Sequence, residues 1–108
     1  MSSSALNIGI TGMRSYQRAL DSSSFNVANA NTSGFSPQRA NFQEASPNGV
    51  VVNISQNAST VGEADAASGT DLATELVNSI QYQAGFDFSA KIVKTADEVL
   101  GTLIDISA

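Results

Sequence analysis

The chain has 108 residues, enough for one small domain, and 42% of them are apolar, as in an ordinary globular protein. It carries five basic and ten acidic residues, for a net charge of −5, and the scattered basic residues exclude a patch for nucleic acid or an anionic membrane. With no Cys and no His, the sequence excludes disulfides, thiolate metal sites and histidine acid–base catalysis, and we expect no cofactor.

Residues 1–35 are predicted to form an amphipathic helix that ends near Ala30 and is followed by a turn. Apolar residues recur at heptad spacing and form the stripe that we expect to pack on another helix: Leu6, Ile10, Met13, Leu20 and Val27. Gly9 and Gly12 lie inside this helix, where each costs about 1 kcal/mol relative to Ala. They indicate either fraying of the helix or a neighbouring element packed closely against its backbone, and we favour the second interpretation.

The turn after this helix is rich in side-chain amides. Its motif residues are Asn26, Asn29, Asn31, Thr32, Gly34 and Phe35. Gly34 suits a left-handed backbone, and Pro37 prevents the helix from resuming. We expect these amides to fix the direction in which the chain leaves the helix.

Residues 36–69 are predicted to form a short extended segment or hairpin and a flexible linker. Residues 39–46 suit a strand, Pro47-Asn48-Gly49 signals a turn, and 50–54 are rich in β-branched residues. Residues 55–69 read as a linker of small and polar residues. Because an isolated hairpin is marginally stable, this one is expected to lean on the helices or on another subunit.

Residues 70–108 are predicted to form one long helix, capped by Thr70 or Asp71. Apolar residues step by threes and fours along it on two adjacent faces, and the candidate packing residues are Leu76, Ile80, Phe88, Ile92, Val99, Leu100 and Leu103. One partner helix covers only one such face, so the other requires a second chain. The expected fold is mainly α, a single unit whose terminal helices pack as an antiparallel or coiled-coil pair around a short hairpin.

Nothing in the sequence forms an active site. The carboxylates are spread along faces that we expect to be solvated, and the Gly9 to Gly12 spacing lacks the Lys-Ser/Thr of a phosphate loop. No run approaches the roughly 18 apolar residues of a membrane helix, and the first residues have no Sec-signal pattern. We therefore expect a protein that is not an enzyme, is not inserted in a membrane, and is cytoplasmic or exported without a Sec signal.

Two groups of residues, one at each end, form a recognisable pattern. The first group comprises Ala5-Leu6, Thr11-Gly12-Met13, Leu20-Asp21 and the run from Asn26 to Phe35; the second comprises residues 71–80, 90–97 and 100–103. The first resembles the N-terminal signature of bacterial flagellar rod, hook and hook-associated proteins. The second resembles the C-terminal module of the same axial proteins.

The resemblance implies a structural subunit of the flagellar basal body, rod-like because its central segment is short, that self-assembles through its terminal helices. Its implied partners are itself, other rod and hook proteins and the flagellar type III export apparatus, which would deliver it across the inner membrane to the periplasmic axial structure. The alternative is an adaptor or export-regulating factor that binds other axial proteins.

Overall fold

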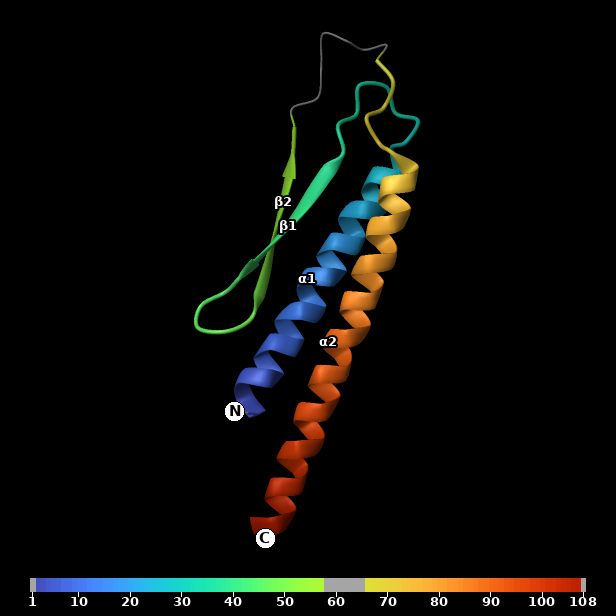
Figure 1. Cartoon of the computed structure of the whole chain (residues 1–108). Helices are drawn as coiled ribbons and strands as arrows, with labels where there is room; N and C mark the ends of the chain where they lie inside the picture. Colours follow the sequence, from blue (N-terminus) through green and yellow to red (C-terminus); the bar gives the residue numbers. More distant parts are fainter. Residues whose placement is uncertain (1, 58–65, 108) are drawn as a thin grey trace.

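The structure, a computed structural model, describes residues 2–57 and 66–107. Helix α1 (Ser2–Ala28) is followed by strands β1 (Gln38–Glu44) and β2 (Val50–Gln56) and by helix α2 (Leu72–Ser107), as Figure 1 shows. Two helices that flank a short antiparallel hairpin confirm the predicted, mainly α fold. Strand β2 extends two residues beyond the expected 50–54, and the predicted linker falls partly outside the described residues.

The two helices run antiparallel and make an elongated molecule. Helix α2 has 36 residues and is therefore about 54 Å long, whereas the 27 residues of α1 span about 40 Å. The C-terminal end of α2 projects past the start of α1 (Figure 1). The molecule measures 68 × 24 × 14 Å, and its radius of gyration is 18.5 Å, compared with about 13 Å for a compact domain of this size. Most of α2 therefore has a neighbour on one side only.

The helices meet along a seam of small residues. A Cβ atom on Gly9 would lie 2.6 Å from Val93 Cγ2, and one on Gly12 would lie 2.5 Å from Ser89 Oγ. Further along α1, Ala19 is fully buried, and Ser23 Oγ lies 2.9 Å from Ser79 Oγ of α2. The glycines therefore allow a close approach of the two backbones, as the sequence favoured.

This seam lies one position before the stripe predicted from the large apolar residues. Seam residues 9, 12, 16, 19 and 23 keep the heptad steps, but 9, 12 and 19 each immediately precede a stripe position (10, 13 and 20), a rotation of about 100° around the helix. Leu6, Ile10, Met13 and Leu20 consequently flank the seam and are half-buried, and Val27 is exposed.

Gly85 of α2 faces the aromatic ring of Tyr16, and a Cβ at this position would overlap three of its ring atoms. We expect Gly85→Ala to destabilise the chain by about 1–2 kcal/mol in urea denaturation, because overpacking outweighs the gain in helix propensity. The matched control is Gly101→Ala, since no atom lies within 4 Å of that Cβ. This control is expected to stabilise by about 0.5–1 kcal/mol; equal effects of the two substitutions would contradict the close packing.

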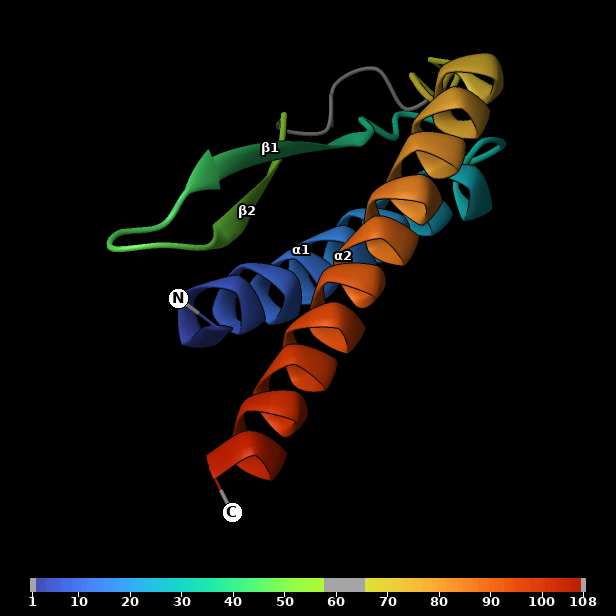
Figure 2. The same cartoon turned by 60° about the horizontal axis from the view of Figure 1, so that its bottom comes forward.

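The hairpin lies against α1 on the face next to the seam (Figure 2). Thr11 Oγ1 accepts a hydrogen bond from the Val50 amide at 3.0 Å, Ser15 Oγ donates to the Val50 carbonyl at 3.1 Å, and Arg18 donates to the Val52 carbonyl at 3.2 Å. The hairpin is therefore held to α1 largely by side chains that bind its backbone, and the buried Val52 side chain adds an apolar contact.

Phe42 of β1 joins the hairpin to both helices. Its ring centroid lies 4.9 Å from that of Tyr16 in α1 and 5.8 Å from that of Tyr82 in α2. Such tilted aromatic pairs contribute roughly 0.5–1.5 kcal/mol each beyond their buried area. The hairpin therefore leans on the helix pair of its own chain, which was one of the two expectations.

Candidate assembly interface

Helix α2 exposes large apolar side chains along most of its length. We call this set the α2 apolar surface; its members are between 42% and 66% exposed and comprise Leu72, Leu76, Val77, Ile80, Phe88, Val99, Leu100 and Leu103. Monomeric soluble proteins rarely expose so many apolar side chains on one element. These exposed side chains make α2 a candidate surface for contact with another molecule.

Part of this surface is hollowed beside the N-terminal end of α1. An apolar groove of about 690 Å³ is lined by Ala5 of α1 and by Phe88, Ile92, Ala96 and Val99 of α2, together with neighbouring Lys91, Thr95 and Leu103. Among the large apolar side chains that the structure describes, Phe88 is the most exposed, at 66%. A groove with such a lining fits the apolar side chains of a packed helix.

Among the predicted packing residues of α2, Leu76 and Ile80 point away from α1. Leu100 and Leu103 lie on the faces of Ser89 and Ala96, but beyond the start of α1 (Figure 1). Leu76, Ile80, Phe88, Val99, Leu100 and Leu103 are exposed, and Ile92 is half-buried. The contacts with α1 come instead from neighbouring positions such as Ser79, Gly85 and Ser89. Of the predicted α2 residues, Phe88, Ile92, Val99 and Leu103 line one groove together, whereas Leu76 and Ile80 lie nearer the start of the helix.

Asn26, in the last turn of α1, clamps the start of the hairpin. Its side chain is 1% exposed. Its amide nitrogen donates to the Gln38 carbonyl at 2.9 Å, and its amide oxygen accepts from the Gln38 backbone N–H at 2.7 Å. Thr70 Oγ1 donates to the Asn26 carbonyl at 3.0 Å. One residue thus fixes the end of α1, the start of β1 and the entrance to α2.

The rest of the turn motif closes the chain reversal. Asn29 donates from its side chain to the Phe25 carbonyl at 2.9 Å and accepts from Thr32 Oγ1 at 3.0 Å. Gly34 has φ = 74°, the left-handed conformation expected for it, and its amide donates to the Ala66 carbonyl at 2.8 Å. Phe35 packs edge-on against Phe25, with centroids 5.5 Å apart. Asn31 is exposed.

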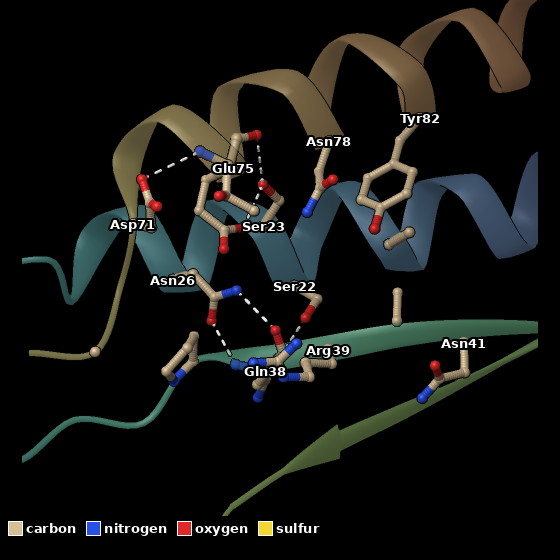
Figure 3. Close-up of a pocket in the computed structure, with 15 residues that line it drawn as sticks. Ser22, Ser23, Asn26, Gln38, Arg39, Asn41, Asp71, Glu75, Asn78 and Tyr82 are labelled. Carbon is tan, nitrogen blue, oxygen red and sulfur yellow. Dashed lines mark hydrogen bonds between the residues drawn. The ribbon is translucent and has the colours of Figure 1, made fainter.

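A polar cavity lies between β1 and the first half of α2 (Figure 3), and the sequence did not predict it. Glu75 lines it and is 6% exposed, and its carboxylate accepts a hydrogen bond from Ser23 Oγ at 2.9 Å. Burial, and then the negative charge of Glu75, raises the pKa of Tyr82 at the cavity wall. The heptad of small residues on α1, which includes Ser23, is the sequence feature that could have indicated a close contact with α2 at this point. It does not by itself identify Glu75 as the partner.

Two further observations concern the described residues, 2–57 and 66–107. Their acidic side chains form no cluster of three that is suited to a metal ion. Neither helix in this part of the chain is long and apolar enough to cross a membrane.

Residues 61–106 match the family described as flagellar basal body rod FlgEFG protein C-terminal, and this match spans nearly the whole of α2. Among curated proteins, none matches the chain. This part of the chain, residues 61–106, is thus similar to the C-terminal module of flagellar basal body rod proteins.

Proposed function

We propose that the protein is a rod-like axial subunit that self-assembles, and assembles with other rod and hook proteins, through its terminal helices. In this proposal the segments 1–35, 36–69 and 70–108 act as one structural unit. Contacts between subunits use the α2 apolar surface, and the half-buried side chains that flank the seam on α1, Leu6, Ile10, Met13 and Leu20, extend these contacts.

The observation that carries this proposal is the exposure of the α2 apolar surface. Helix α1 covers one side of α2, and the outer side keeps residues such as Ile80 and Phe88 more than 60% exposed. Burying such a side chain contributes about 1.5–3 kcal/mol. Association of neighbouring subunits along this surface would therefore be strongly favourable.

The turn motif has a second role in the proposal. Because Asn26 and Gly34 hold the hairpin and the start of α2 at one end of the helix pair, every subunit presents its α2 apolar surface in the same orientation. A uniform orientation is what a helical assembly requires. We further propose that the chain reaches the periplasmic axis through the flagellar type III export apparatus, as the family resemblance implies.

The alternative from the sequence, an adaptor or export-regulating factor, uses the same apolar surface transiently. Copy number separates the two functions. We expect purified basal bodies to contain several copies of the chain, in fixed ratio to other rod proteins, when measured by quantitative mass spectrometry. A chain that is present in the cell extract but missing from washed basal bodies would contradict the subunit and favour the regulator.

A further inference from the structure

The C-terminal end of α2 is negatively charged. After Lys94 the sequence has three acidic residues, Asp97, Glu98 and Asp105, and no basic one, so the last turn of α2 contains no cation. The carbonyl end of a helix also carries a partial negative charge, which a nearby cation stabilises. Asp97 is exposed, and its carboxylate forms no hydrogen bond or ion pair among the described residues. This end of α2 therefore favours a cation from outside the chain.

The same end exposes apolar side chains on the face that carries Asp97. Helix α2 has 36 residues against 27 in α1, and the surplus of about 14 Å projects past the start of α1 (Figure 1). There Leu100 is 42% exposed and Ile104 is 60% exposed. Asp97, Leu100 and Ile104 are three and four positions apart, so they share one face of the helix. Glu98, by contrast, points about 160° away from Leu100.

A groove on the helix pair combines an apolar floor with a positive rim. Its volume is about 600 Å³, and the residues that line it present mostly apolar atoms: Met13, Arg14, Gln17 and Arg18 of α1 and Phe86 of α2. The two arginines cover it with their aliphatic stems and keep their charged ends in water. Arg18 donates to a carbonyl of the hairpin. Arg14 is exposed, and among the described residues its guanidinium forms no hydrogen bond or ion pair.

The acidic, apolar end of α2 and this groove are complementary, but one chain cannot join them. Leu100 lies 14 residues beyond Phe86 on the same straight helix, a separation of about 21 Å. Two different surfaces that fit each other form a head-to-tail contact, which continues from copy to copy as a helical assembly. We propose that the α2 end of one copy docks in the groove of the next, where Asp97 pairs with Arg14. This inference rests on the proposed function and specifies which surfaces of two copies meet.

Charge reversal, measured by sedimentation equilibrium at low salt, tests this contact. We expect Asp97→Lys and Arg14→Glu each to weaken self-association at least about tenfold, because each brings two like charges together at the contact. Both side chains are exposed, so both variants are expected to keep the wild-type helical content by circular dichroism. Glu98→Lys is the matched control, since it changes the net charge equally on another face. We expect it to change association by less than about twofold, because isolated surface charges contribute little.

An equimolar mixture of Asp97→Lys and Arg14→Glu tests the pairing itself. Every contact between the two variants again joins opposite charges, so we expect the mixture to associate at least about tenfold more strongly than either variant alone. A mixture that associates no better, or a Glu98→Lys chain as weak as Asp97→Lys, would overturn the contact. Wild-type association of Asp97→Lys would also overturn it; if Phe88→Asp still prevented association, the proposed subunit would stand. A wild-type chain that stays monomeric would overturn both.

Discussion

Phe88→Asp is expected to abolish self-association of the chain while leaving its helix pair folded. Phe88 is 66% exposed in the single chain and borders the groove next to α1, so the substitution removes little internal packing. At a subunit contact it would bury an unpaired carboxylate, at a cost of about 3 kcal/mol or more, which corresponds to at least about a hundredfold weaker association. Sedimentation equilibrium over a range of concentrations measures this effect.

The control for Phe88→Asp is Gln43→Glu, on the exposed side of β1. It adds the same negative charge and keeps the oxygen that accepts a hydrogen bond from Asn53 at 3.1 Å. We expect this variant to associate as the wild type does, and both variants to keep the wild-type helical content by circular dichroism. A Phe88→Asp chain that still associates, or that supports normal swimming, would contradict assembly through the α2 apolar surface.

Asn26→Ala is expected to destabilise the chain by about 2–4 kcal/mol in urea denaturation. The substitution leaves both the N–H and the carbonyl of Gln38 without the side chain that binds them, and each unsatisfied buried group costs about 1–3 kcal/mol. Faster hydrogen exchange of the Gln38 amide should accompany the loss, because this N–H donates to Asn26.

The matched control is Asn31→Ala in the same turn. Asn31 is exposed, and we expect its replacement to change the free energy of unfolding by less than about 0.5 kcal/mol. Comparable losses of unfolding free energy in the two variants would show that the two amides contribute equally to stability. In that case the clamp assigned to Asn26 would be wrong.

Local patterns predicted the elements well. Heptad spacing predicted α1, and continuous steps of three and four predicted α2 to the end of the described chain. Asp71 caps α2, as its side chain and position indicated, and Gly34 adopts the left-handed conformation. Each of these features depends on residues close together in sequence, so the sequence alone is sufficient to indicate them.

The packing of α1 could not be predicted in the same way. Its large apolar residues were expected to form the seam, yet Gly9, Gly12, Ala19 and Ser23 form it instead. Small residues produce no hydrophobic signal, and their value lies in how closely they let two backbones approach. That benefit exists only where the facing residues of α2, such as Ser89 and Val93, are in position.

The sequence by itself determined that this protein has two long amphipathic helices, a polar turn between elements, no histidine or cysteine chemistry, and more apolar surface than one helix pair conceals. Only the tertiary structure decided which surface stays outside. One face of α1 meets the hairpin and the next meets α2, through pairs such as Ser15 and Val50, 35 positions apart, and Gly9 and Val93, 84 positions apart. The position of Glu75 in the polar cavity could not be predicted for the same reason. Its carboxylate is bound by Ser23, which is 52 residues away, and a local sequence pattern does not indicate a contact between such distant residues.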